Sequence, residues 1–213
     1  MMQAFPDLIY EPVTMGTTLI AVQFKGGVAI AADSRSAMGT YVSNRVANKI
    51  TQITDYIYCC RAGSAADTQT LAEVVQYELD FYEREIGQQP TVRAAANVLR
   101  GLCYEYRDRM TASIICAGWD RQTGGQIYNI SAGGSLVPQR IAASGSGSLY
   151  ITGFLDSQYR PDMTKEECAE LCLKAVSLAI KRDGSSGGVC RLAVITEDGV
   201  EKRMIPNDQL PQF

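Results

Sequence analysis

The sequence contains no histidine. This absence removes both the usual general base of hydrolases and the commonest metal-binding side chain. A Ser-His-Asp or Cys-His arrangement therefore cannot be assembled within this chain. The cysteines include no Cys-x-x-Cys pair and lack the spacing of a zinc site, so we expect no metal and no cofactor. Any hydrolase built on this chain must draw its base from another group.

Long apolar runs and clusters of basic residues are also missing. A membrane-spanning helix needs about 20 consecutive apolar residues, and runs such as 27–32 and 114–117 are much shorter. The net charge is −3, and the lysines and arginines are scattered singly along the chain. This distribution disfavours a membrane or a nucleic acid as the partner.

The overall composition is that of one ordinary globular domain. The chain has 213 residues, of which 46% are hydrophobic and 20% are charged. Seven cysteines form an odd number without the spacing of a disulfide framework, so we expect reduced thiols in a cytosolic or nuclear protein. Residues 1–16 lack the basic start of a secretory signal, and we interpret them as a short leader that maturation removes. We expect residues 17–213 to form a single domain.

Two kinds of hydrophobic periodicity alternate along the chain. Strand-forming runs separated by turn residues predict strands over 17–24, 28–33, 50–53, 57–61, 113–119, 126–131, 135–143, 189–196 and 200–205. Helical spacing after capping signals predicts helices over 64–86, 91–106 and 164–182. The order of strands, paired helices, strands, paired helices and strands indicates an α+β domain. In such a domain two packed antiparallel sheets would lie between two helix layers.

A hydroxyl nucleophile can work without histidine when a free α-amine on the same residue accepts its proton. An α-amine has a pKa of about 7.7 to 8.0, which suits a general base near neutral pH. Thr17 would gain such an amine if the bond after Gly16 were cut, and glycine leaves that carbonyl free of side-chain crowding. The alternative is that Thr17 and Thr18 simply begin a strand.

Two charged residues could meet at the start of this strand. Asp33 ends the second predicted strand and Lys49 opens the next one, so a sheet could bring both beside Thr17. A lysine ammonium there would favour ionisation of the hydroxyl, and the aspartate would keep that lysine charged and oriented. Each residue alone has an ordinary alternative, which is an aspartate that caps a turn or a solvated lysine.

Two glycine-containing loops carry further polar side chains. Asp183 and Ser186 lie in Asp-Gly-Ser-Ser-Gly-Gly after the last predicted helix, and Ser146 lies in Gly-Ser-Gly. Beside Thr17 these side chains could hydrogen-bond to its amine. The alternative for the first loop is a helix C-cap followed by a tight turn. Neither loop suits phosphate binding, because neither matches the P-loop pattern.

Arg61 and Gly63 stand at the end of another predicted strand. The backbone N–H of Gly63 could face a reacting carbonyl as an oxyanion donor, and the glycine permits close approach of a substrate. If Arg61 projects into the adjoining pocket, its planar charged group would favour an acidic substrate side chain. A surface or interface ion pair is the alternative.

Taken together, these motifs are similar to those of a known family. The motifs are GTT at 16–18, GGVAIAADSR at 26–35, NKI at 48–50, CCRAGSAADTQ at 59–69, GSG at 145–147 and RDGSSGG at 182–188. The chain closely resembles the β-type subunits of the eukaryotic 20S proteasome from about Gly16 to its C-terminus. The CCRAGSAADTQ segment resembles the caspase-like, first type of these subunits in particular.

The resemblance implies a fold and a set of residue roles. The fold is the N-terminal nucleophile hydrolase fold, a four-layer αββα sandwich. Thr17 is implied to be the nucleophile of a threonine endopeptidase, released by autocatalytic cleavage of the Gly16–Thr17 bond. The other implied catalytic residues are Asp33 and Lys49 as charge partners of Thr17, Ser146, Asp183 and Ser186 as supporting groups, and Gly63 at the oxyanion position.

The resemblance also implies a pocket for the residue before the scissile bond. Its walls or borders would be formed by Ser36, Ala47, Thr51, Arg61, Ala65 and Gln69. Arg61 would give this pocket its charge and a preference for cleavage after acidic residues. Ala47 departs from the small hydroxyl residue often seen at this position in similar subunits.

The implied partners are other proteasome subunits. The chain would join a seven-membered β ring between α rings in a 28-subunit barrel, in the cytoplasm and nucleus, and act on unfolded polypeptides. One alternative is a structural β subunit that assembles but never matures. Another is a bacterial-type ring protease or a different amidohydrolase of the same fold. Arg61 within the CCRAGSAADTQ segment disfavours this second alternative.

Overall fold

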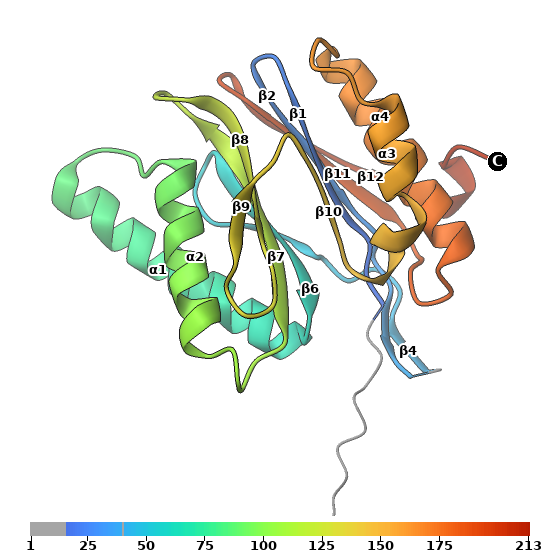
Figure 1. The fold of residues 1–213 in the computed structure, drawn as a ribbon, viewed down its shortest axis with the longest axis horizontal. Helices are drawn as coiled ribbons and strands as arrows, with labels where there is room; N and C mark the ends of the chain where they lie inside the picture. Colours follow the sequence, from blue (N-terminus) through green and yellow to red (C-terminus); the bar gives the residue numbers. More distant parts are fainter. Residues whose placement is uncertain (1–15, 40) are drawn as a thin grey trace, which may run out of the picture.

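Two antiparallel sheets of five strands each form the centre of the molecule, which we describe from a computed structural model covering residues 16–39 and 41–213 (Figure 1). One sheet has the order β10-β1-β2-β11-β12, with bounds Ile141–Ser144, Leu19–Phe24, Gly27–Ala32, Cys190–Thr196 and Gly199–Ile205. The other has the order β5-β6-β7-β8-β9, with bounds Ile50–Gln52, Ile57–Gly63, Ala112–Asp120, Gly124–Ile130 and Leu136–Pro138. A short hairpin of β3 (Ser36–Met38) and β4 (Tyr41–Asn44) stands apart from both sheets.

Helices cover the outer face of each sheet. The helices α1 (Ala65–Ile86) and α2 (Val92–Glu105) lie on one side of the sandwich, and α3 (Thr152–Gln158) and α4 (Lys165–Arg182) lie on the other (Figure 1). Two short 3₁₀ helices, η1 (Ser146–Tyr150) and η2 (Asn207–Gln209), complete the described elements. The predicted four-layer αββα arrangement is confirmed.

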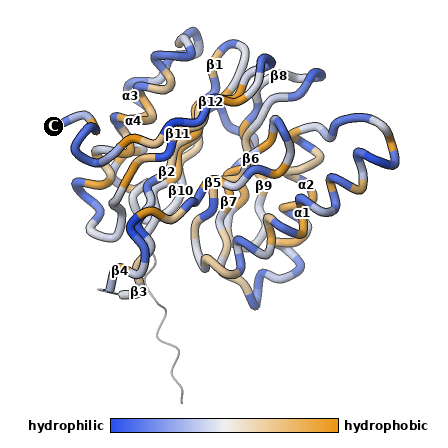
Figure 2. The backbone as a smooth tube through the Cα atoms, turned by 180° about the vertical axis from the view of Figure 1, so that it is seen from behind, coloured by the Kyte–Doolittle hydropathy of each residue, from blue (hydrophilic) through white to orange (hydrophobic). Residues whose placement is uncertain are grey.

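The helices begin where their capping residues predict. The hydroxyl of Ser64 accepts a hydrogen bond from the N–H of Asp67 at the start of α1. Thr164 and Glu167 form a reciprocal capping box at the start of α4. Figure 2 shows hydrophilic and hydrophobic residues alternating along α1, as expected for a helix with one buried face.

The hairpin of β1 and β2 is the central element of its sheet. Every residue of β2 is buried, because one face of this sheet packs against α4 and the other against the second sheet. Ile20 and Val22 face the α4 side, whereas Leu19 and Ala21 face the second sheet. A strand that is buried on both faces needs apolar side chains at every position, which explains the lack of polar residues in β2.

One predicted strand is wrong. Residues 135–143 were expected to form a single strand, but the structure divides them between β9 in one sheet and β10 in the other. Pro138, at the end of β9, has no N–H to continue a ladder, and the chain crosses between the sheets at the next two residues. The β3–β4 hairpin, η1 and α3 are further elements for which the sequence pattern defined no bounds.

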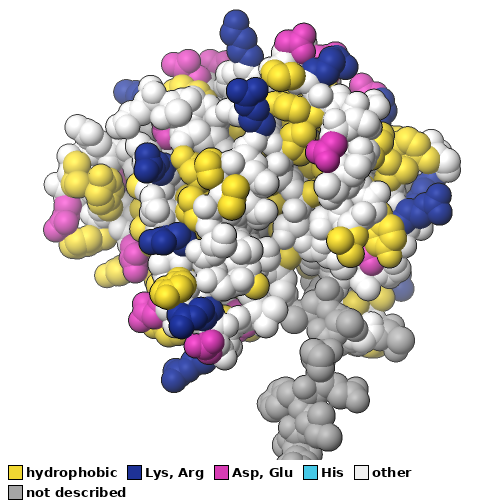
Figure 3. All heavy atoms as spheres, viewed as in Figure 1, with side chains coloured by type: hydrophobic (Ala, Val, Ile, Leu, Met, Phe, Trp, Pro, Cys, Tyr) yellow, Lys and Arg dark blue, Asp and Glu magenta, His cyan; other side chains and the backbone are white. Residues whose placement is uncertain are grey.

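The surface charges, the helices and the cysteines can each be compared with what the composition predicts. On the face shown in Figure 3, basic and acidic side chains are intermixed, and neither sign gathers into one area. Among the described residues, no helix is both long enough and apolar enough to cross a bilayer. All seven cysteines are buried and unpaired.

Candidate active site

Antiparallel pairing of β1 and β2 places the start of one strand beside the end of the other. Leu19 lies opposite Ala32, so Thr17, just before β1, and Asp33, just after β2, lie at neighbouring strand ends at one edge of the sandwich. Lys49 directly precedes β5 in the second sheet and reaches the same point. Thr17, Asp33 and Lys49 are 5%, 0% and 8% exposed, so the cluster is almost closed to solvent in this form of the chain.

Asp33 and Lys49 form a buried ion pair. The ammonium of Lys49 lies 2.8 Å from one carboxylate oxygen of Asp33, which also accepts the backbone N–H of Thr18. The other carboxylate oxygen accepts the N–H groups of Arg35 and Gly187. Burial lowers the pKa of Lys49 below its ordinary value, and the charge and hydrogen bond of Asp33 only partly oppose this.

The carbonyl oxygen of Gly16 accepts two hydrogen bonds within this cluster. The hydroxyl of Thr17 donates to it at 2.7 Å, and the ammonium of Lys49 donates at 2.9 Å. A cation at a carbonyl oxygen draws electron density from the carbonyl carbon and makes that carbon more open to attack. The arrangement therefore places a hydroxyl and a polarising cation around the bond that joins Gly16 to Thr17.

Three hydrogen-bonded side chains form a second cluster, which contacts the nitrogen of Thr17 through Ser146. The backbone N–H of Thr17 donates to the hydroxyl of Ser146 at 3.1 Å. The hydroxyls of Ser146 and Ser186 both donate to the same oxygen of Asp183, at 2.7 and 2.6 Å. Burial would raise the pKa of Asp183, but hydrogen bonds from Ser186, Ser146 and the N–H of Ser185 outweigh it and lower that pKa. Asp183 is thus held as a carboxylate that is connected to the nitrogen of Thr17 through the Ser146 hydroxyl.

Glycine is needed where loops approach this cluster. Gly145 has a positive φ of 83°, and a Cβ there would overlap the carbonyl of Thr17. A Cβ at Gly147 would overlap the hydroxyl of Thr18. At Gly16 the same addition would overlap the backbone and Cβ of Ser185. The Gly-Ser-Gly loop can therefore bring Ser146 to Thr17 only because its flanking residues have no side chains.

A cavity of about 280 Å³ opens in front of Thr17. Its described lining residues are Gly16, Thr17, Arg35, Ser36, Ala37, Asn44, Ala47, Asn48, Lys49, Arg61, Gly63, Ala65, Thr68 and Gln69. None of these residues is acidic, whereas three of them, Arg35, Lys49 and Arg61, are basic. The cavity therefore offers a cationic environment to an anionic group.

Arg61 is held by neutral oxygen atoms. Its Nε donates to the hydroxyl of Thr51 at 2.8 Å, and its two terminal nitrogens donate to the Thr68 hydroxyl at 3.3 Å and the Asn48 carbonyl at 2.9 Å. No carboxylate within 16–39 or 41–213 lies at ion-pair distance from Arg61. The guanidinium is oriented without being neutralised, so its charge is available to a group in the cavity.

The structure brings the sequence-predicted residues together with one difference in detail. Of the residues expected around the pocket, Ser36, Ala47, Arg61, Ala65 and Gln69 line the cavity. Thr51 is not among the lining residues, but its hydroxyl accepts a hydrogen bond from Arg61, which lines the cavity. The expected leader lies outside the described residues except for Gly16.

Sequence reasoning missed several residues that complete the site. These are Thr18, Arg35, Asn48 and Thr68, which bind Asp33, line the cavity or hold Arg61. Asn48 takes part through its backbone carbonyl, which no side-chain pattern could reveal. Thr18 and Arg35 stand next to predicted site residues, and this proximity was the one available signal.

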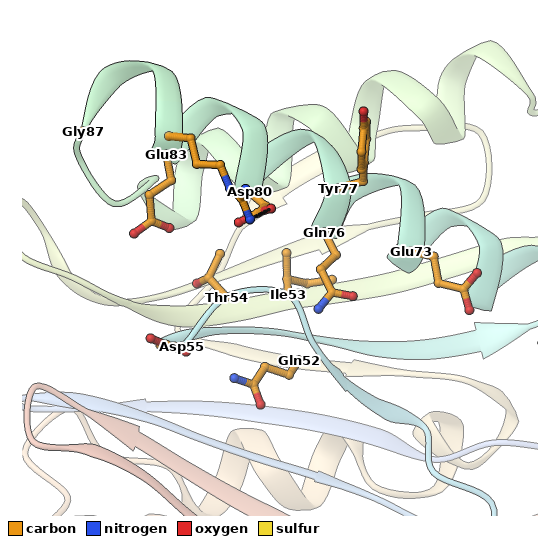
Figure 4. Close-up of a pocket in the computed structure, with 11 residues that line it drawn as sticks. Gln52, Ile53, Thr54, Asp55, Glu73, Gln76, Tyr77, Asp80, Glu83 and Gly87 are labelled. Carbon is orange, nitrogen blue, oxygen red and sulfur yellow. Dashed lines mark ion pairs between the residues drawn. The ribbon is translucent and has the colours of Figure 1, made fainter.

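A larger groove of about 860 Å³ lies elsewhere, between α1 and the segment that follows β5 (Figure 4). Its labelled residues include the acidic side chains Asp55, Glu73, Asp80 and Glu83. The groove contains neither Thr17 nor any residue of the Lys49 and Asp183 clusters. Among the described residues, no group of three or more His, Cys, Asp or Glu side chains is placed to hold a metal ion.

Comparisons with known proteins agree on one family. A family model described as proteasome subunit matches residues 13–195. The chain is 50% identical to proteasome subunit beta type-6 of Dictyostelium discoideum, over 98% of this chain and 97% of that protein. It is 47% identical to a probable proteasome subunit beta type-1 of Schizosaccharomyces pombe, over 92% and 87% respectively. It is 46% identical to proteasome subunit beta type-9 of Salmo salar, over 98% and 95%.

Proposed function

The chain belongs to the proteasome subunit family, and from this premise we propose that it is a catalytic β subunit with Thr17 as its nucleophile. The observation that carries the proposal is the pair of hydrogen bonds that Thr17 and Lys49 donate to the carbonyl oxygen of Gly16. A subunit with a purely structural role would not need a buried ammonium at that oxygen. Burying such a charge is costly unless it is paired, as Lys49 is with Asp33.

Maturation begins at the Gly16–Thr17 bond. The hydroxyl oxygen of Thr17 attacks the Gly16 carbonyl carbon, and Lys49 stabilises the negative charge that develops on the carbonyl oxygen. The C–N bond breaks, the proton of the hydroxyl passes to the nitrogen of Thr17, and an ester joins Gly16 to the Thr17 oxygen. Water hydrolyses this ester and releases the leader with a carboxyl end, so that Thr17 carries a free hydroxyl and a free amine.

The mature residue can then act on a substrate peptide bond. The Thr17 oxygen attacks the substrate carbonyl, and its own amine takes the hydroxyl proton directly or through a water molecule. The N–H of Gly63 stabilises the oxyanion, the amine product leaves with a proton, and water hydrolyses the acyl-enzyme. Ser146 and Asp183 keep the amine in place, because the Thr17 nitrogen already contacts Ser146 in the uncleaved chain.

Arg61 would favour cleavage after acidic residues. A substrate aspartate or glutamate side chain entering the cavity would meet a guanidinium that neutral oxygen atoms hold in place. No acidic group among the described lining residues would compete for that charge. We expect the substrates to be unfolded polypeptides, because an extended segment must reach Thr17 at the edge of the sandwich.

The proposal includes assembly and location. The chain would occupy one position in a seven-membered β ring, between α rings, within a 28-subunit barrel in the cytoplasm and nucleus. Its relatives carry the names of proteasome β subunits, and the match extends over nearly their whole length. Ser36 and Ala37 of β3, Asn44 of β4 and Ala47 line the cavity, where a neighbouring subunit could complete its wall.

The deciding experiment is the intact mass of the chain in assembled particles. We expect a chain that begins at Thr17 and a peptidase activity toward acidic substrates that appears together with this form. A Thr17→Ala chain should assemble but keep its leader and lack this activity. If fully assembled, active particles retain residues 1–16 on the wild-type chain, the structural alternative is correct and Thr17 is not the nucleophile.

A further inference from the structure

Thr18 connects the two halves of the site through its backbone and its side chain. Its N–H donates to Asp33 at 2.8 Å, on the same carboxylate oxygen that binds Lys49. Its hydroxyl lies 2.7 Å from the hydroxyl of Ser186, which in turn contacts Asp183. Thr18 is 0% exposed, so no solvent molecule can replace either contact without opening the core.

The direction of the hydroxyl contact follows from counting protons. Ser186 has one hydroxyl proton, and it donates this proton to the carboxylate of Asp183 at 2.6 Å. The oxygen of Ser186 can therefore only accept at its contact with Thr18. Thr18 must donate, which produces a one-way chain of hydrogen bonds from Thr18 through Ser186 to Asp183.

The same argument gives Ser146 a defined orientation. The hydroxyl of Ser146 also donates its hydrogen bond mainly to Asp183. Its oxygen lone pairs are therefore free to accept the N–H of Thr17. Asp183 can hold both serines in this way only if neither hydroxyl rotates toward another acceptor. The Thr18 hydroxyl donates to the oxygen of Ser186. This contact keeps the Ser186 proton directed at Asp183.

We infer that Thr18 is a positioning residue for Thr17 and couples the Lys49–Asp33 pair to the Ser146–Asp183–Ser186 cluster. The inference rests on the proposed function, since it assigns a residue to the same reaction. The side-chain contact fixes the Thr18 backbone, and the fixed N–H keeps Asp33 oriented toward Lys49. One buried side chain thus orients the groups on both sides of the reacting threonine.

The fold makes room for this contact at a specific place. Gly147 lies against the Thr18 hydroxyl so closely that a Cβ would overlap it. The N–H of Gly147 also donates to the carbonyl of Thr17 at 3.1 Å. The Thr18 hydroxyl is therefore confined between Gly147 and Ser186, and it cannot turn to a different partner without moving the Gly-Ser-Gly loop.

The test uses assembled particles with the full chain carrying Thr18→Val, which keeps the side-chain shape but removes the hydroxyl. We expect removal of residues 1–16 to slow about 10-fold, the effect of one lost hydrogen bond in a charged network. Thr18→Ser, which keeps the hydroxyl, should stay within about 3-fold of the wild type. Thr70→Val is the matched control, because that exposed hydroxyl only contacts Ala66 within α1.

A double-mutant cycle distinguishes positioning from packing. In a Ser186→Ala background, Thr18→Val should slow processing by less than about 2-fold, because the contact is already broken. The same cycle applies to unfolding of the full chain. The effect of Thr18→Val on the unfolding equilibrium constant should be about 10-fold smaller in the Ser186→Ala background than in the wild type. This second readout does not depend on activity. A wild-type chain that is never processed would therefore refute the proposed function while the cycle still decides the role of Thr18.

Two results would overturn the inference. One is an equal loss for Thr18→Ser and Thr18→Val, because retaining the hydroxyl in serine would then give no protection. The other is an undiminished effect of Thr18→Val in the Ser186→Ala background. If Thr18→Val does not fold, Thr18→Ser is compared with Thr18→Ala, and equal processing rates for these two overturn the inference.

Discussion

The ammonium of Lys49 lies 2.9 Å from the carbonyl oxygen of Gly16, on the peptide group that precedes Thr17. The same ammonium is bound to Asp33, which also receives three backbone N–H groups. The cation that would assist attack is therefore in position before the peptide bond is cut. This geometry connects the buried ion pair to the chemistry of maturation and leads to several predictions.

Replacing Lys49 by methionine should prevent maturation. Loss of the donor at the Gly16 carbonyl oxygen should slow cleavage by about 100-fold or more, the usual cost of removing one oxyanion donor. The variant should also lose about 3 to 5 kcal/mol of stability, because Asp33 would remain buried without its cation. Intact mass and urea unfolding measure the two effects. Lys165→Met, at a surface ion pair with Glu201, is the control and should change neither by much.

Gly16→Ala should impair cleavage through a steric effect. A Cβ at this position would overlap Ser185, so either the scissile carbonyl or the Ser185 loop must move. A displacement of about 1 Å at a reacting group can cost about 100-fold in rate, and we expect a loss of this order in a time course of leader removal. Gly153→Ala is the matched control, since a Cβ there would meet no atom within 4 Å apart from its chain neighbours and the backbone of its own helix. Cleavage of Gly16→Ala at the wild-type rate would contradict the described approach of Ser185.

Arg61→Met should separate substrate choice from maturation. We compare kcat/KM for cleavage after glutamate with kcat/KM for cleavage after leucine. The ratio of the two should fall about 100-fold, as expected for a lost buried charge pair. Leader removal should stay within about 3-fold, because Arg61 does not contact Gly16 or Thr17 in the described hydrogen bonds. Arg61→Lys should give an intermediate ratio, because lysine keeps the charge but cannot hold all three acceptors. An equal loss of both activities would argue against a role limited to specificity.

Asp183 should make stability depend on pH in the acid range. Its pKa is lowered in the folded chain, so it adds stability above the unfolded aspartate pKa of about 3.9 and loses this contribution as pH falls through the folded value. Asp183→Asn should therefore cost about 1 to 3 kcal/mol at pH 7 and progressively less below pH 3.9. Urea unfolding at several pH values measures the difference. Asp108→Asn, at an exposed carboxylate, is the control, and a cost for Asp183→Asn that is independent of pH would contradict the prediction.

The strand and helix pattern could be predicted because its signals are local. The α4 capping box and the apolar runs of β1 and β2 are each contained in a few neighbouring residues. Residues 135–143 show where such signals end. The pattern continues through the segment, but the partners of its two halves lie in different sheets, and only packing between distant strands assigns them.

The chemical options of this protein follow from its amino-acid composition and its local motifs. Without histidine, a hydroxyl nucleophile needs another base, and Thr17 preceded by Gly16 is a residue that can supply one. Residue types and motifs also pointed to Lys49 and Asp183, since composition and local spacing do not depend on how the chain packs.

How these groups meet depends on the packing of the folded chain. Ser146 reaches the nitrogen of Thr17 across 129 residues of sequence, and the Thr18 hydroxyl meets Ser186 across 168. Such contacts depend on strand register and on loops whose glycines allow close approach, as at Gly147. They arise from the packing of distant segments, for which a single chain carries no periodic signal, and so the connection through Thr18 could be found only in the folded molecule.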